Sequence, residues 1–341
     1  MASMKIARKI IGEDCEPLMF AEEGQANQGD FNVAINMCKL AADAGADGIE
    51  FQLFLADDMY IRNDSGHALY RKRELSSGQI KDLILYAHEE KLIFQVAGLS
   101  PHIIDLCAKA GADIFCVNAS DLTNPNIIDA VIQTGKPFWL ATLMATLEEI
   151  DWAVNYALAH SNSDVGLLHG QHVMSSDKTM GVPSDLLQLD CINLFKRRYG
   201  LVTGFVDHTA TSFVPAIAAS KGANLIMKHL SPTNNWKGPD WVVCLDPSSW
   251  KNARSMVEYA WKANGESKEI SQAEFKDRSI HRRSIYTARS LKAGQKISIH
   301  DLIALRPGKG GIDPRFISEI LDRYVKHDLT EQQQIQFTDF E

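Results

Sequence analysis

The sequence predicts an α/β fold, a (β/α)8 TIM barrel followed by a small β-rich domain. Eight short, nearly continuous apolar runs recur along the first two thirds of the 341 residues, and stretches with helical periodicity separate them. Eight strand–helix units in about 250 residues is the arithmetic of a closed barrel. Polar side chains gather at the carboxyl ends of the runs, where this fold builds its active sites. A doubly wound open sheet is the alternative arrangement.

The apolar runs have the length and composition of strands that are buried on both faces of a parallel sheet. The expected strands span residues 18–24, 48–54, 92–98, 113–119, 137–143, 165–171, 202–208 and 224–230. The expected helices span residues 31–44, 77–90, 102–110, 124–134, 147–159, 183–198 and 213–221. Asp30 precedes the first helix as an N-cap, and the glycines of the AGAD and KGAN segments end helices just before a strand.

The change in composition after the last strand predicts three parts of the chain. We expect residues 1–262 to form the barrel domain. Residues 263–279 are polar and lose apolar periodicity, which predicts a linker. Residues 280–341 contain short apolar segments broken by glycine turns, and they are too few for a second barrel. A small β-rich domain is therefore expected there.

Charge and cysteine usage restrict the class of protein. The chain carries 35 Lys and Arg against 43 Asp and Glu, a net charge of −8, so we expect no nucleic-acid partner. No apolar run has the length of a membrane span, and the amino terminus lacks the apolar core of a secretory signal. The six cysteines form no CxxC pair, which indicates free thiols in a reducing compartment. These features predict a soluble cytoplasmic protein.

Short motifs at successive strand ends add a family resemblance that covers nearly the whole chain. The motifs are AEEGQANQGD (21–30), AGADGIEFQ (44–52), SDLTNP (120–125), LLHG (167–170), GFVDHT (204–209), GPDW (238–241) and RPGKGG (306–311). In this order the chain resembles the sialic acid synthase (N-acetylneuraminate synthase) family, which pairs a barrel with a C-terminal antifreeze-like (SAF) domain. The resemblance implies a metal-dependent condensation of phosphoenolpyruvate with an N-acetylated amino sugar, in nonulosonic acid or surface polysaccharide biosynthesis.

Two histidines are the predicted metal ligands. His208 and His229 match the metal-binding histidines of the family, and they end neighbouring predicted strands, so both imidazoles can reach one divalent ion. The resemblance implies Mn or Mg as the metal. The alternative interpretation is that each histidine only satisfies a buried hydrogen bond. Glu22 and Asp240 match carboxylates that contact the sugar or a metal-bound water, and such a group can act as a general base. For Asp240, capping of a loop is the alternative.

Four further residues are predicted to bind the small-molecule substrates, and they are Gln52, Ser120, Lys228 and Arg306. Gln52 and Ser120 match motif positions on the barrel rim, while Lys228 precedes one of the predicted metal ligands. The resemblance implies that Arg306, in the small domain, reaches the sugar site of a partner subunit. A domain-exchanged homodimer is therefore expected, although Arg306 can also be an ordinary turn residue.

The chain departs from the family at the expected phosphoenolpyruvate site. Glu50 and Val117 stand where the family has lysines, and hydroxyl side chains are replaced at three positions, Ala97, Ala141 and Val206. An anion site needs cations and aligned donors, so these changes put the use of phosphoenolpyruvate in doubt.

Three interpretations follow from this departure. The first is a true synthase in which Lys228, His169 and His172 take over anion binding. The second is a related metal-dependent lyase or aldolase that acts on a sugar acid without phosphoenolpyruvate. The third is a catalytically silent sugar-binding protein. The sequence alone identifies neither the sugar nor the metal.

Overall fold

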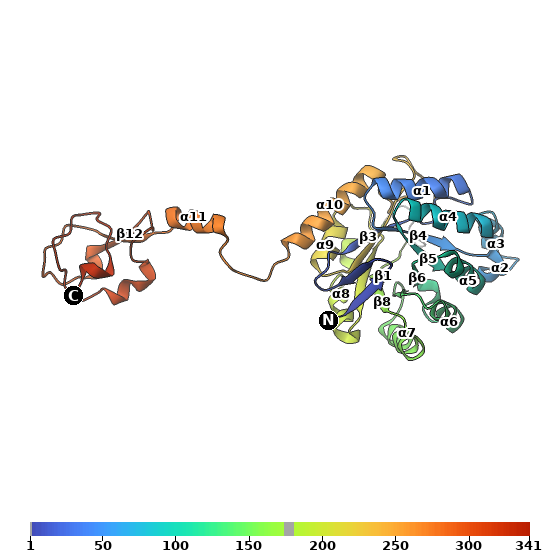
Figure 1. Ribbon diagram of the computed structural model, residues 1–341, viewed down its shortest axis with the longest axis horizontal. Coiled ribbons are helices and arrows are strands. Elements are labelled where there is room, and N and C mark those ends of the chain that lie inside the picture. The colour runs from blue at the N-terminus through green and yellow to red at the C-terminus, as the bar shows by residue number, and fades with distance from the viewer. Residues whose placement is uncertain (1, 174–180) are drawn as a thin grey trace. The chain divides into compact units, whose positions relative to one another are not determined.

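Eight parallel strands close into a barrel, which confirms the predicted fold class (Figure 1). The structure, a computed structural model, describes residues 2–173 and 181–341. The strands follow one another around the barrel in chain order, and β10 closes it by pairing with β3. They are β3 (Leu18–Glu22), β4 (Gly48–Leu53), β5 (Ile93–Gly98), β6 (Ile114–Val117), β7 (Phe138–Ala141), β8 (Val165–Gly170), β9 (Val202–Asp207) and β10 (Leu225–His229). Each lies within the range that the sequence predicted.

Helices that follow the strands in the chain pack around the barrel. They are α1 (Phe31–Asp43), α4 (Ser77–Glu89), α5 (Pro101–Ala110), α6 (Pro125–Gln133), α7 (Leu147–His160), α8 (Cys191–Tyr199), α9 (Val214–Ser220) and α10 (Pro247–Ala263). Asp30 caps α1 as expected, because its carboxylate accepts hydrogen bonds from the backbone N–H groups of Asn32 and Val33.

Three parts of this helical layer differ from the sequence prediction. The helix expected over 183–198 is a 3₁₀ turn (Ser184–Leu186) followed by the shorter α8. Two short helices, α2 (Ala56–Met59) and α3 (Ser65–Arg71), lie between β4 and α4. Helix α10 was not predicted, although Asp246 caps it and Pro247 occupies its first turn, the usual signals of a helix start.

The barrel wall separates two apolar layers, because successive strand residues point to opposite faces. One core cluster lies inside the barrel and includes Phe20, Trp139, Leu225 and Met227. The other lies between the strands and the helices and includes Phe51, Phe94, Phe115 and Val117. This alternation decides which polar strand residues reach the barrel interior.

An amino-terminal hairpin, which the sequence analysis did not predict, supplies part of the inner core. Strands β1 (Ser3–Ile6) and β2 (Lys9–Gly12) pair antiparallel. Their buried side chains Met4, Ile6 and Ile11 belong to the same cluster as the inward residues of the barrel strands. The hairpin therefore packs against the barrel interior at the end of the barrel where the strands begin.

The chain divides into two compact units, Met1–Gly265 and Glu266–Glu341. The second unit has its own apolar core around Ile285, Leu291 and Ile335. Its strands β11 (Ser284–Thr287) and β12 (Leu302–Leu305) pair antiparallel, and isolated bridges extend the pairing. Its short 3₁₀ helices are Ile299–Asp301, Pro314–Glu319 and Phe337–Asp339, while another 3₁₀ turn (Ala119–Asp121) follows β6 in the first unit.

The segment predicted as a linker contains a helix. Helix α11 (Gln272–His281) begins at a capping box in which Ser271 and Glu274 satisfy each other's backbone N–H groups. None of its residues is buried, so the helix lacks the apolar stripe on which the prediction depended. Across the described residues, no helix combines the length and apolarity needed to cross a bilayer.

Candidate active site

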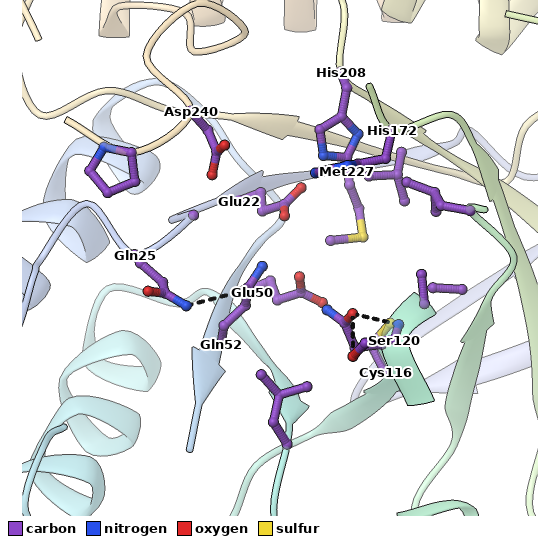
Figure 2. Close-up of a pocket in the computed structure, with 18 of the residues that line it drawn as sticks. Glu22, Gln25, Glu50, Gln52, Cys116, Ser120, His172, His208, Met227 and Asp240 are labelled. Atoms are coloured by element: carbon purple, nitrogen blue, oxygen red, sulfur yellow. Dashed lines mark hydrogen bonds between the residues drawn. The ribbon is translucent and has the colours of Figure 1, made fainter. Parts of the chain in front are cut away.

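A cavity of about 470 Å³ opens at the carboxyl ends of the barrel strands, where the sequence predicted the site. Seven of the eight strands place inward side chains on it, and a residue just after β5 completes the ring. These side chains are Glu22, Glu50, Gln52, Leu99, Cys116, Ala141, Leu168, Val206, Met227 and His229. Figure 2 shows carboxylate, amide and imidazole groups of these strands and their loops turned into one space.

Glu22, His208 and His229 meet on one side of the cavity. One candidate ligand atom from each side chain lies within 4.8 Å of the other two, and all three residues are buried. Glu22 and His229 are register partners on β3 and β10, and His208 directly follows β9. The separation between Glu22 Oε2 and His229 Nδ1 is 3.4 Å, and the two imidazole ring centres lie 5.1 Å apart.

These three residues fit a divalent metal ion. Glu22 Oε2, His208 Nδ1 and His229 Nδ1 are buried, and none has a hydrogen-bond partner among the described residues. Buried polar atoms without partners are costly, and several facing one another indicate a group that would satisfy them. Two imidazoles and one carboxylate match the ligand preferences of Mn, Fe or Zn.

Burial sets the protonation of these ligands. Burial lowers the pKa of His208 well below its ordinary value, and the neighbouring His229 and His172 add to that effect. Burial likewise lowers the pKa of His229 to about 3, so both imidazoles are neutral, the form that binds metals. Burial raises the pKa of Glu22 well above its ordinary value, and the carboxylates of Glu50 and Asp240 raise it further. A cation that binds here therefore favours the ionised form of Glu22 and opposes the effect of burial.

The loop after β3 packs against His229. Gly24 has a φ of +57°, and a Cβ at this position would lie 2.5 Å from the His229 ring. The carboxylate of Glu23 holds the loop by accepting hydrogen bonds from the backbone N–H groups of Gln25 and Asn27, at 3.0 and 2.5 Å. Burial raises the pKa of Glu23 to about 7. Glycine is thus required for the close approach of backbone and imidazole.

Asp240 also faces the cavity. Its Oδ2 lies 3.9 Å from His229 Nε2, and its backbone adopts a φ of +53°. Burial raises the pKa of this half-buried carboxyl. Asp240 therefore stands close enough to a metal bound by the histidines to meet a substrate there.

A chain of polar side chains lines another part of the cavity wall. Gln25 Nε2 donates to Gln52 Oε1 at 3.2 Å, and Arg73 Nη1 donates to Gln25 Oε1 at 2.9 Å. The structure thus places the predicted residue Gln52 on the cavity, and it also places Ser120 there. Arg73 was missed because it lies in an irregular segment between β4 and α4, where no strand-end position marks it.

Two residues considered for anion binding do not reach the cavity. Lys228 is fully buried on the outward face of β10, where its Nζ donates to the Thr209 carbonyl at 2.5 Å and lies 3.1 Å from Asp207 Oδ2. His169 also points outward, with Nε2 3.0 Å from the Leu187 carbonyl. The structure thus places neither side chain on the cavity, because each is one position away from an inward neighbour. His172 does line the cavity, with its ring 5.0 Å from that of His208.

Arg306 lies in the second unit, where it is exposed and precedes a cis peptide bond to Pro307. The proposed reach of Arg306 into a partner's site stays a prediction.

The inner part of the cavity, which we call the floor, is formed by Glu50, Cys116, Ala141, Leu168, Val206 and Met227. Val117, where the sequence analysis expected a family lysine to be replaced, faces the helices, whereas its neighbour Cys116 faces the floor. Ala97, another expected replacement, belongs to the inner core.

Glu50 on the floor is only 3% exposed and accepts a hydrogen bond from Gln95, and burial raises its pKa to about 7. Among the described lining residues Arg73 is the one arginine, and there is no lysine.

Comparison with known proteins agrees with this architecture. The model of the NeuB family matches residues 37–269, and that of the SAF domain matches residues 282–341. The chain belongs to the NeuB family. The predicted resemblance to sialic acid synthases with a C-terminal SAF domain is thereby confirmed.

Known proteins match this chain over most of its length. The chain is 29% identical to the uncharacterized protein MJ1065 of Methanocaldococcus jannaschii, over 99% of both chains. It is 28% identical to the N,N′-diacetyllegionaminic acid synthase of Campylobacter jejuni, over 91% of this chain and 97% of that one. The N-acetylneuraminic acid synthetase structure from Leptospira borgpetersenii has the same fold, with a TM-score of 0.74 and 22% identity over 81% of this chain and 94% of that one.

Proposed function

We propose that this NeuB-family protein is a metal-dependent enzyme of carbohydrate biosynthesis that makes a carbon–carbon bond at the aldehyde of an N-acetylated amino sugar. The observation that carries the proposal is the buried cluster of Glu22, His208 and His229 on the wall of the barrel cavity. The names of similar proteins, among them the N,N′-diacetyllegionaminic acid synthase, support the sugar class. An activity of the nonulosonic acid synthase type is the resulting hypothesis.

The metal would be held by the Glu22 carboxylate and the imidazoles of His208 and His229. The family resemblance implies Mn or Mg, and two nitrogen ligands favour Mn. When bound, the ion would polarise the carbonyl oxygen of the open-chain sugar as a Lewis acid. Its ligands are pre-set for this task, because burial keeps both imidazoles neutral.

The chain's own groups would position the sugar and move protons. Asp240, near His229 and with a raised pKa, can exchange a proton with a sugar hydroxyl or with water. The Arg73–Gln25–Gln52 chain offers donors and acceptors for the hydroxyl and N-acetyl groups. Ser120 adds a hydroxyl at the rim. Together these groups would hold the aldehyde carbon toward the cavity interior.

The first candidate for the second substrate is phosphoenolpyruvate, as the family resemblance implies. Its C3 would bond to the aldehyde carbon, the aldehyde oxygen would take up a proton, and water would add at C2. Loss of inorganic phosphate then leaves a 2-keto-3-deoxy acid.

Phosphate release from phosphoenolpyruvate, with Mn²⁺ and a panel of N-acetylhexosamines, tests this reaction directly. We expect any activity to disappear in His208→Ala, whereas His169→Asn, with an outward histidine changed, keeps it. Activity that survives His208→Ala would contradict the metal-dependent reaction.

A second candidate function is a lyase or aldolase that acts on a sugar acid without phosphoenolpyruvate. The floor favours it over the first candidate, because Glu50 and apolar side chains offer no cation to the phosphate group of phosphoenolpyruvate. Release of an aldehyde from 2-keto-3-deoxy sugar acids, with no phosphate formed, would identify this reaction. If the protein binds a sugar but neither a metal nor the phosphoenolpyruvate or sugar-acid substrates, it is the catalytically silent sugar-binding protein.

We further propose a cytoplasmic, domain-exchanged homodimer. All six cysteines are free in the structure, as expected in a reducing compartment. The dimer rests on the family resemblance of the motif around Arg306. Light scattering that shows a monomer at micromolar concentration would contradict it.

A further inference from the structure

The floor of the cavity combines one buried carboxylate with an apolar wall. Figure 2 shows Glu50 between Glu22 on one side and Cys116 on the other, with Met227 nearby. One oxygen of Glu50 accepts a hydrogen bond from the Gln95 amide, a group that donates and brings no positive charge. The remaining floor residues, Cys116, Ala141, Leu168, Val206 and Met227, carry no charge.

No described cation offsets Glu50. Lys228 pairs with Asp207 on the outward face of the barrel. Arg73 lines the cavity but is tied to Gln25 in the loop after β3. His172 stands beside His208, which belongs with Glu22 and His229 to the group of candidate metal ligands that we call the metal cluster.

The lining carboxylates, Glu22, Glu50 and Asp240, therefore outnumber the lining guanidinium and ammonium groups of the described chain. A divalent cation at Glu22 and the histidines would offset part of this charge, but Glu50 would still face the floor. A like charge brought to a buried carboxylate is repelled strongly, because little solvent screens the pair. An anionic group on the floor would also lose its hydration without gaining a donor from the apolar wall.

We propose that the floor binds an uncharged group that carries a hydroxyl or a carbonyl, and that Glu50 is the residue that excludes anionic second substrates, phosphoenolpyruvate included. The inference rests on the proposed metal-dependent function of the same cavity, and it counts against phosphoenolpyruvate as the second substrate. A hydroxyl of the ligand would donate to the free oxygen of Glu50, while its carbon skeleton would contact the apolar wall.

The test uses two probes that share one skeleton, dihydroxyacetone and dihydroxyacetone phosphate. Calorimetry is carried out at pH 8 on the full chain loaded with Mn²⁺. We expect wild type to bind the uncharged probe at least about tenfold more tightly than the phosphorylated one. Phosphoenolpyruvate should bind no better than the phosphorylated probe.

Substitutions at Glu50 give the direction of the effect. Glu50→Gln removes the charge and keeps the hydrogen bond from Gln95, so the preference should shrink by about tenfold. Glu50→Lys should reverse the preference, a change of about 100-fold or more. Met144→Lys is the matched control, because Met144 also lines the cavity but is 65% exposed, so water screens the added charge. The control should change the preference by less than about threefold.

Tighter binding of the phosphorylated probe by wild type, or binding of neither probe, would overturn the proposal. An equal preference in wild type and in Glu50→Gln would also overturn it. Glu50→Gln keeps the shape of the site, so this outcome can be measured even if Glu50→Lys fails to fold. Mn²⁺ stoichiometry and binding of N-acetylmannosamine are measured on the same samples. Their loss would contradict the proposed function, whereas their presence together with tight binding of phosphoenolpyruvate would contradict only the role of the floor.

Discussion

The metal cluster and the floor occupy the same cavity but have opposite character. Glu22, His208 and His229 present buried polar atoms without partners, an arrangement that a cation would satisfy. Glu50 on the floor already accepts a hydrogen bond, and its other neighbours are apolar. Glu22 and Glu50 are nevertheless register partners on adjacent strands. The two parts of the cavity can differ although their strands are neighbours, because each strand contributes its own side chain to the rim.

Removal of either imidazole should have the largest effect. His208→Ala or His229→Ala should abolish stoichiometric Mn²⁺ binding, because two remaining ligands hold a divalent ion poorly. The fold should persist, because each substitution removes an imidazole whose buried Nδ1 has no hydrogen-bond partner among the described residues. Equilibrium dialysis with metal analysis measures the effect, and His169→Asn should bind like wild type. Wild-type binding by the double alanine variant would show that the ligand assignment is wrong.

Lys228 should matter for stability and not for the metal. Lys228→Met leaves the buried Asp207 carboxylate unpaired, which should cost about 3–5 kcal/mol in the free energy of unfolding. Chemical denaturation measures the loss, and Asp207→Asn in the same chain should recover much of it. Mn²⁺ stoichiometry should stay unchanged. Loss of the metal in a folded Lys228→Met protein would instead place Lys228 in the site.

Glu50→Gln should stabilise the protein at alkaline pH. Burial raises the pKa of Glu50 to about 7 from its ordinary 4.5. A raised folded-state pKa gives stability that is present below about pH 4.5 and is lost as the pH rises through about 7. The variant lacks this loss, so it should exceed wild type by about 2–3 kcal/mol near pH 8 and by much less near pH 5. Urea unfolding at both pH values is the measurement, and equal differences at the two would contradict it.

Gly24→Ala should weaken the metal cluster by a smaller amount. The added methyl group would press on the His229 ring, and displacement of a supporting group costs about tenfold in metal affinity. Gly45→Ala is the matched control, because Gly45 also has a positive φ, +83°, but no atom lies within 4 Å of the added Cβ. Both variants should lose about 1 kcal/mol of stability from backbone strain. Equal metal affinities in the two would show that the contact with His229 is unimportant.

The barrel and two of the three candidate metal ligands could be predicted from the sequence because their signals are local, whereas Glu22 was predicted as a catalytic carboxylate and not as a ligand. Apolar runs mark the strands, and His208 and His229 stand at the ends of two of them. Lys228, Val117 and His169 were expected at the cavity but lie in the outer layer, because a shift of one residue along a strand moves a side chain from one face to the other. Arg73 could not be found, since it follows two short helices that carry no strand-end signal. Helix α11 was not predicted within the expected linker, because none of its residues is buried against a core.

The position of a bound metal tests the account most directly. Anomalous diffraction from crystals grown with Mn²⁺ should show one strong peak between the Glu22 carboxylate and the imidazoles of His208 and His229. No peak there, or a peak at other side chains while this cluster stays empty, would contradict the metal-dependent function proposed for the cavity.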